Sequence, residues 1–208
     1  LVEPDGERTF ATYLGAASEL HPDDITPERL QGFDIFFVEG YLVYNHALIT
    51  AAVVAAKNAG LAIALDLASY NVVEANLALL NELVDSYVDI VFANEEEAKA
   101  FTGLEPLEAV ANLSGRCDIA IVKVGKEGAY IQQGASLCHV PAAGDLVVDT
   151  TGAGDFFAAG FLSGLAKGYN LEKSGKLGAL LASRVIRVPG AKLNEDEWSE
   201  IRKIEQAL

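Results

Sequence analysis

The chain has 208 residues, of which 51% are hydrophobic and 22% are charged. This length fits one domain, and this composition can bury a sizeable core, which excludes an intrinsically disordered chain. Thirty acidic residues against fifteen basic ones give a net charge of −15. Such a charge repels polyanions, so nucleic acid and anionic membranes are excluded as general partners, and any phosphate must be bound by a few local donors.

The remaining composition bears on the compartment. Cys117 and Cys138 form neither a disulfide framework nor a metal-ligand spacing, which favours a reducing, cytoplasmic setting. Apolar runs stay well below the ~20 residues that span a bilayer, and the charged first residues do not resemble a signal peptide. The sequence contains no methionine, which indicates that it is not the whole translated protein.

Strand-like and helix-like segments alternate along the chain. In chain order we predict a strand at 8–14, a strand at 34–39, a helix at 45–58, a strand at 62–67, a helix at 72–87, a strand at 89–93, a helix at 94–101, a helix at 107–113, a strand at 119–124, a turn at 125–128 leading into a hairpin strand at 129–132, a strand at 146–148 and helices at 154–167, 171–187 and 195–206. Continuous apolar strands between helices predict an α/β fold, in which a mostly parallel sheet is covered on both faces. We expect residues 1–208 to form a single domain.

The most informative segment is LVVDTTGAGDFFAAGFLSGL, residues 146–165. A buried strand is predicted to end at 149–151, and the turn from Gly152 to Gly154 opens a helix with Asp155 in its first turn. Unpaired amides at a helix start form a site for an anion such as a phosphoryl group, and a carboxylate there can accept a proton from a hydroxyl. The alternative is structural: Asp155 complements the helix dipole and the glycines only make a tight turn.

Two other phosphate motifs are excluded. The sequence has no GxxxxGK[ST] loop, and the third glycine of a dinucleotide-binding GxGxxG is replaced by Phe157. Phe157, Phe161 and Leu165 recur every four residues, which predicts a core-facing stripe on this helix. Gly160 and Gly164 are expected to permit close packing of a neighbouring helix.

The glycine turn DTTGAGD and the helix after it resemble the second signature of the ribokinase-like (PfkB) family of carbohydrate and nucleoside kinases. Three further matches follow the family's order: NEEE at 94–97, KVGKEG at 123–128 and PGA at 189–191. The resemblance implies a three-layer α/β/α sandwich with a small β lid, of which residues 1–14 would be a remnant. Residues 8–20 and 87–98 look most like the adenosine kinase branch.

The resemblance implies a catalytic set at the glycine turn. Asp155 would be the base that takes the proton from a primary hydroxyl of the substrate. The backbone amides of Gly152, Ala153 and Gly154 would form the anion hole for the transferring phosphoryl group. ATP would be the donor and Mg²⁺ its companion ion.

Further roles follow at the other two motifs. Asn94 and Glu97 would act near the Mg²⁺ and its waters, although simple capping of the following helix explains them equally well. Lys123, Gly125 and Gly128 would line the nucleotide side of the site. The alternative for these residues is a plain hairpin turn, since GKEG forms one in many contexts.

Two groups of residues carry weaker implications. Gly178 and Ala182, on the penultimate helix, match adenine-pocket positions of the family. Asp149 and Thr151, with the backbone near Gly190, match the place where many members hold a monovalent cation such as K⁺.

We therefore expect a kinase of a small-molecule nucleoside or sugar, with adenosine-like substrates favoured over ribose-like or fructose-like sugars. One alternative is a non-catalytic regulator that binds nucleotide or sugar with the same fold. Another is a phosphosugar kinase, which needs a cationic pocket that Arg8, Arg184 and Arg187 would have to supply. In the family an exposed lid edge can pair between subunits, which would make a homodimer. The segment 39–41 reads as a simple turn, but it lies where α/β sheets bind ligands.

Overall fold

The computed structural model describes residues 13, 15–144 and 146–208. Apart from Tyr13, the strand expected at 8–14 lies outside these residues, as does Arg8. The described part contains a six-stranded sheet whose strands follow one another in chain order: β1 Ile35–Glu39, β2 Ala62–Asp66, β3 Ile90–Asn94, β4 Ile119–Lys123, β5 Ala129–Gln133 and β6 Ser136–Val140. The first four strands pair in parallel, β5 pairs antiparallel with β4, and β6 pairs antiparallel with β5. The mostly parallel α/β sheet and the predicted hairpin after β4 are therefore confirmed.

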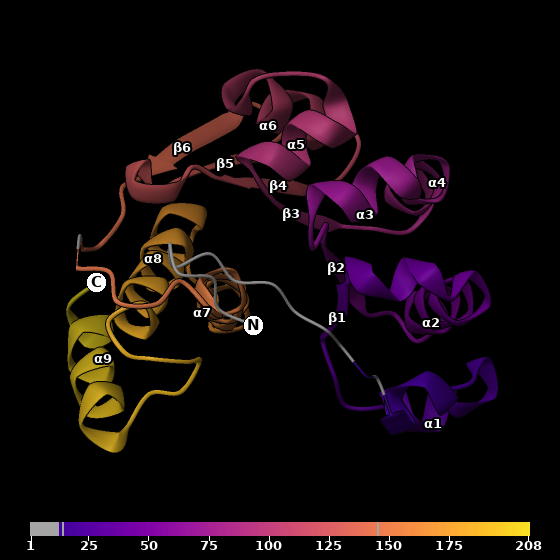
Figure 1. Cartoon of the computed structure of the whole chain (residues 1–208), viewed down its shortest axis with the longest axis horizontal. Coiled ribbons are helices and arrows are strands. Elements are labelled where there is room, and N and C mark those ends of the chain that lie inside the picture. The colour runs from indigo at the N-terminus through magenta and orange to yellow at the C-terminus, as the bar shows by residue number, and fades with distance from the viewer. Residues whose placement is uncertain (1–12, 14, 145) are drawn as a thin grey trace.

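Helices cover both faces of the sheet, which makes three layers (Figure 1). One face carries α2 to α6, and the other carries α7 and α8, with α9 packed against α8. The helices are α1 Pro27–Leu30, α2 His46–Asn58, α3 Tyr70–Ala75, α4 Leu77–Ser86, α5 Glu95–Thr102, α6 Pro106–Ser114, α7 Ala153–Ala166, α8 Leu171–Val185 and α9 Glu195–Ala207. No helix among the described residues is long and apolar enough to cross a bilayer.

The alternation of side chains along each strand divides the core into two clusters. In β3, Val91 and Ala93 join the cluster under α2 to α6, whereas Ile90 and Phe92 join the cluster under α7 and α8. Because successive strand residues point to opposite faces, an unbroken apolar run is what a sheet covered on both sides requires. Phe92 meets Phe161 of α7 edge to face, with 5.7 Å between the ring centroids.

The predicted strand at 146–148 is wrong. Leu146, Val147 and Val148 lie in a loop and are 56%, 56% and 57% exposed. The backbone amide of Val148 donates to the carbonyl of Ile186 at 2.7 Å, so this segment is tied to the end of α8 and not to the sheet. A β-branched apolar run predicts a strand only where a neighbouring strand supplies the pairing.

Two smaller differences have local causes. The helix expected at 72–87 is split into α3 and α4 at Asn76, where φ is −130° and the side-chain amide donates to the Val72 carbonyl at 3.0 Å. Asparagine breaks helices in this way because its side chain competes for backbone partners. Strand β6 was not predicted; the signal was the two-residue Gly134–Ala135 turn, where φ of Gly134 is +55°.

Helices α7 and α8 pack with small residues at their contact. A Cβ on Gly160 would lie 2.8 Å from the Gly178 Cα, and one on Gly164 would lie 2.8 Å from the Ser174 Cα. Phe157 and Phe161 are buried in the core beside this contact. The predictions of a core-facing stripe and of close helix packing on α7 are therefore confirmed.

Candidate active site

The carboxyl ends of the parallel strands and the start of α7 line one cleft of about 1570 Å³. The strand register aligns the last residues of neighbouring strands: Glu39 of β1 is opposite Asp66 of β2, and Asn94 of β3 is opposite Lys123 of β4. All four residues line the cleft. Open α/β sheets bind ligands at this edge, because the loops leave the strands there.

The start of α7 forms the opposite wall. Gly152 is the N-cap with φ +79°, and a Cβ on it would lie 2.8 Å from the Ala191 Cβ, so the turn requires glycine. The first helical residues, Ala153, Gly154 and Asp155, line the cleft with Gly152. Their amides have no helical acceptor one turn earlier, although that of Ala153 donates to the Thr150 carbonyl at 3.2 Å. The exposed Asp155 carboxylate stands beside this group of donors.

Asn94 and Glu97 form a reciprocal cap on α5. The Asn94 amide donates to Glu97 Oε2 at 2.7 Å, the Asn94 side chain donates to Glu97 Oε1 at 2.8 Å, and the Glu97 amide donates to Asn94 Oδ1 at 2.8 Å. The capping interpretation is confirmed, and both residues also line the cleft. Glu97 is only 3% exposed. Burial raises the pKa of its carboxyl, and the charge of Lys123 opposes that rise.

The side chain of Lys123, the last residue of β4, reaches toward Asp66 of β2 and the start of α7. Its Nζ is 3.0 Å from Asp66 Oδ2, and both side chains are less than one-fifth exposed. The position of a Cβ on Gly154 would be 3.2 Å from the same Nζ, so the ammonium borders the first turn of α7. Asp66 was missed by the sequence analysis. The available signal was an acidic residue at the carboxyl end of a buried strand.

The turn after β4 supplies the next part of the cleft. Gly125 has φ +54° and Gly128 has φ +102°, and a Cβ on Gly128 would fall 1.9 Å from the Val140 carbonyl oxygen. The Val124 amide donates to the Gly128 carbonyl at 2.8 Å, which closes the turn. The hairpin interpretation is therefore confirmed, and Gly125 and Gly128 also line the cleft.

An apolar wall continues beyond this turn. It is made by residues of α8 and of the loop after β6, namely Ala142, Ala143, Val147, Ala179, Ala182 and Ile186. Ala182, which the resemblance matched to an adenine-pocket position, lines the cleft. Gly178 is placed elsewhere: it packs against Phe157 of α7, with a Cβ at 2.8 Å from the Phe157 carbonyl oxygen, and its neighbour Ala179 lines the cleft. The loop residues carried no sequence signal.

The family model described as "pfkB family carbohydrate kinase" matches residues 1–198. The chain belongs to this family. A nucleoside kinase from Methanocaldococcus jannaschii is 35% identical over 125 residues, which cover 59% of this chain and 40% of that protein. An adenosine kinase from Sinorhizobium meliloti is 37% identical, with a TM-score of 0.89 over 98% of this chain and 64% of that one. A probable sugar kinase from Rhizobium etli is 35% identical, with the same TM-score over 98% and 63%.

The family assignment and the ribokinase-like fold expected from the sequence are confirmed. The chain spans less than two thirds of the length of each of these three relatives.

The three residues matched to the family's monovalent-cation region are brought together. Asp149 Oδ1 accepts the Thr151 amide at 2.8 Å, and Oδ2 accepts the Gly190 amide at 2.9 Å. The carboxylate thus joins the loop before α7 to the loop after α8. Of the three residues, Thr151 lines the cleft.

The β1 side of the cleft holds residues of the segment 39–41, which the sequence predicted as a turn at the edge where α/β sheets bind ligands. Glu39 and Tyr41 line the cleft, and the Tyr41 hydroxyl donates to the Ala68 carbonyl at 3.3 Å. Burial raises the pKa of Tyr41, and the nearby carboxylates of Glu97 and Asp66 add to the rise. This side therefore combines an aromatic ring with several acidic groups.

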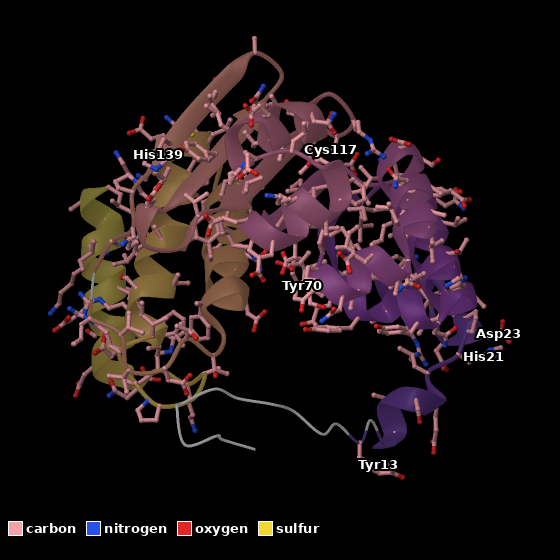
Figure 2. All side chains as sticks on the ribbon, turned by 45° about the horizontal axis from the view of Figure 1, so that its top comes forward. Tyr13, His21, Asp23, Tyr70, Cys117 and His139 are labelled. Atoms are coloured by element: carbon pink, nitrogen blue, oxygen red, sulfur yellow. The ribbon has the colours of Figure 1, made fainter. Side chains whose placement is uncertain are left out.

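The described histidines and Arg184 do not line the cleft. His21 and His139 lie far apart, on opposite sides of the molecule (Figure 2). Among the described residues no three His, Cys, Asp or Glu side chains form a metal cluster. Arg184 pairs with Glu197 and Glu200 of α9 and does not line the cleft. The cationic pocket required for a phosphosugar is therefore not formed by Arg184.

Proposed function

We propose that the chain carries the phosphoryl-transfer site of an ATP-dependent kinase that phosphorylates a primary hydroxyl of a nucleoside or sugar. Adenosine-like nucleosides are the favoured substrates, ahead of ribose-like and fructose-like sugars. The observation that carries the proposal is the position of Asp155. It stands in the first turn of α7, beside the amides of Gly152 and Gly154, at the wall of a cleft that faces the strand ends.

The chemistry follows from that arrangement. Asp155 accepts the proton of the substrate hydroxyl as its oxygen attacks the γ-phosphorus of ATP. The bond between that phosphorus and the β–γ bridging oxygen breaks, and the electron pair leaves with ADP. The amides of Gly152 and Gly154 donate to the oxygens of the transferring group, where negative charge develops, and the amide of Ala153 joins them by exchanging its bond to the Thr150 carbonyl for one to the phosphoryl group. These donors are fixed by the glycine turn before the reaction begins.

The residues present fit a magnesium ion bound with the nucleotide. Mg²⁺ prefers oxygen ligands, retains several waters, and is usually bound through one or two carboxylates plus substrate phosphates. Asn94 and Glu97 offer amide and carboxylate oxygens at the cleft, while the described residues form no three-carboxylate cage of their own. The ion would neutralise phosphate charge, and these two residues would hold it or its waters.

The size and walls of the cleft support two ligands at once. Its volume of about 1570 Å³ exceeds the roughly 300–1,000 Å³ of a pocket for one small molecule. The apolar wall formed by Ala142, Ala179 and Ala182 suits an adenine ring, and the Gly125–Gly128 turn lies beside it. On the other side, Glu39 can accept hydrogen bonds from sugar hydroxyls, and the Tyr41 ring can stack on a nucleobase. The aromatic ring is the reason to place nucleosides first.

A monovalent cation is part of the proposal. Asp149 joins the loop before α7, which contains the glycine turn, to the loop after α8. K⁺ bound beside Asp149 would therefore stabilise the anion hole. We expect K⁺ to raise the turnover number with little effect on the melting temperature.

The test is ADP release by the protein expressed from its complete gene. The assay uses Mg-ATP with adenosine, inosine, cytidine, ribose, fructose, fructose 6-phosphate and 2-keto-3-deoxygluconate, with and without K⁺. The proposal predicts that one nucleoside or sugar raises ADP release. Asp155→Asn should lower that turnover by ~10²–10⁴-fold, with an unchanged circular dichroism spectrum.

Two outcomes would contradict the proposal. Equal turnover by wild type and Asp155→Asn would show that Asp155 is not the catalytic base. ATP binding without turnover of any acceptor would favour the non-catalytic regulator. Ala159→Ser is the matched control, because Ala159 is exposed on the same helix and does not line the cleft.

A further inference from the structure

The ion pair between Asp66 and Lys123 joins two strand ends that are 57 residues apart in sequence. The side chains are 15% and 17% exposed, respectively. Partial burial strengthens the attraction and restricts both side chains, in contrast to a surface pair, which solvent screens. Both residues line the cleft. A partly buried charge there needs a compensating partner, which is either the opposite charge of the pair or a bound ligand.

The Asp66 carboxylate is fixed on both oxygens. Oδ2 accepts from Lys123 at 3.0 Å, and Oδ1 accepts from the Ala68 amide at 2.9 Å. Ala68 has φ +68° and is the one non-glycine residue with positive φ in the described part of the chain. The Tyr41 hydroxyl in turn donates to its carbonyl. Strained backbone of this kind persists where its surroundings hold it, and it occurs often at functional sites.

The fixed carboxylate determines where the ammonium lies. Lys123 Nζ would be 3.2 Å from a Cβ on Gly154, which is the second residue of α7. An ammonium group has three N–H donors, and the Asp66 bond uses one of them. The others can reach an anion at the start of α7, where the amides of the glycine turn already favour negative charge.

We propose that Lys123 contacts the terminal phosphate of the nucleotide and that Asp66 is a positioning residue for it. Asp66 holds the ammonium over the first turn of α7, so that no side-chain reorganisation is needed when the phosphoryl group moves. This inference rests on the proposed kinase function and deepens it. It predicts that Lys123 recognises the phosphate chain and makes no contribution to binding of the adenosine moiety.

The chain offers a matched control pair at the opposite edge of the same sheet. Lys57 Nζ lies 2.6 Å from Asp89 Oδ1, and Asp89 Oδ2 accepts the Ile63 amide at 2.7 Å. This pair has the same chemistry, an aspartate fixed by a backbone amide and bonded to a lysine. It lies outside the cleft, so changes in Lys57 or Asp89 report only the structural worth of such a pair.

The first experiment measures binding by calorimetry, using adenosine and a non-hydrolysable ATP analogue with an imido bridge between the β and γ phosphates. Lys123→Met should weaken analogue binding about 10- to 100-fold, the usual range for a lost bond to a charged group. Adenosine has no phosphate, so its binding should change less than about twofold. Lys57→Met should leave both affinities unchanged, and Lys123→Arg should recover part of the loss. Equal losses for adenosine and the analogue, or no loss for either, would overturn the assignment of Lys123.

The second experiment separates positioning from binding. Asp66→Asn keeps an oxygen for the Ala68 amide but removes the charge that localises Lys123. It should lower kcat about 10- to 100-fold while the KM for the acceptor stays within about threefold. Asp89→Asn should shift the melting temperature by about as much as Asp66→Asn does, but it should leave kcat unchanged. An Asp66→Asn variant with wild-type kcat would overturn the positioning role.

The two proposals fail separately. If wild type binds the analogue but turns over no acceptor, the kinase function is lost, and selective loss of analogue binding in Lys123→Met still supports the phosphate contact. If wild type does not bind the ATP analogue, both proposals are overturned.

Discussion

The substitution Gly160→Ala tests the close contact of α7 with α8, on which the placement of the glycine turn depends. The added Cβ would lie 2.8 Å from both the Gly178 Cα and the Leu177 carbonyl oxygen. Ordinary contacts of a Cβ begin near 3.4 Å, so the helices must separate locally by more than half an ångström. All of the near atoms belong to backbone and cannot rotate away.

The expected magnitude is a difference of two effects. Overpacking a tight core costs roughly 1–3 kcal/mol, and the backbone contact places this site near the upper end. Replacing glycine by alanine inside a helix returns about 1 kcal/mol through helix propensity. We expect Gly160→Ala to lower the free energy of unfolding by ~2 kcal/mol. For a chain of this size that corresponds to a fall of roughly 4–8 °C in melting temperature.

The assay is urea unfolding followed by circular dichroism, with thermal melting as a second measure. Ala159→Gly, at the exposed neighbouring position of the same helix, measures the propensity term without a clash and should cost about 1 kcal/mol. The sum of the two losses is the cost of the contact. If Gly160→Ala were instead more stable than wild type by about the propensity term, the tight crossing would be refuted.

Two further predictions concern a turn and a thiol. Gly128→Ala should destabilise the protein by ~3 kcal/mol or more, because φ is +102° and the Cβ would meet the Val140 carbonyl oxygen at 1.9 Å. Gly134→Ala, with φ +55° but open space around it, should cost only about 1 kcal/mol in the same melting assay. Equal costs would contradict the role of the close contact. Burial raises the pKa of Cys117 to about 12, so alkylation by iodoacetamide at pH 8, read by peptide mass spectrometry, should be about 1,000-fold slower than in urea. The native rate should rise about tenfold per pH unit over about pH 7–9, where the buried thiol is still almost entirely protonated, and a native rate equal to the unfolded one would disprove the burial.

Local patterns were sufficient for most of the fold. Unbroken apolar runs predicted the parallel strands, because a strand buried on both faces has no polar alternation. The asparagine at 94 and the glutamate at 97 predicted their own cap, since every bond of that motif lies within four residues. The run at 146–148 failed for the converse reason. Whether an apolar triplet becomes a strand depends on a partner strand, and the amides at 148 and 149 are satisfied instead by the Ile186 carbonyl.

In the candidate site too, the features that are adjacent in sequence were predictable, and those brought together only by the fold were not. The glycine turn and Asp155 are contiguous, so the spacing that predicts a helix start also predicts donors beside a carboxylate. Asp66 stands alone in the sequence, as one polar residue at the end of an apolar run. Its proximity to Lys123 arises only from the parallel register, which brings the ends of four strands to one edge. A lysine can therefore be proposed for a nucleotide site from the sequence, but the carboxylate paired with it becomes visible only when the strands are aligned.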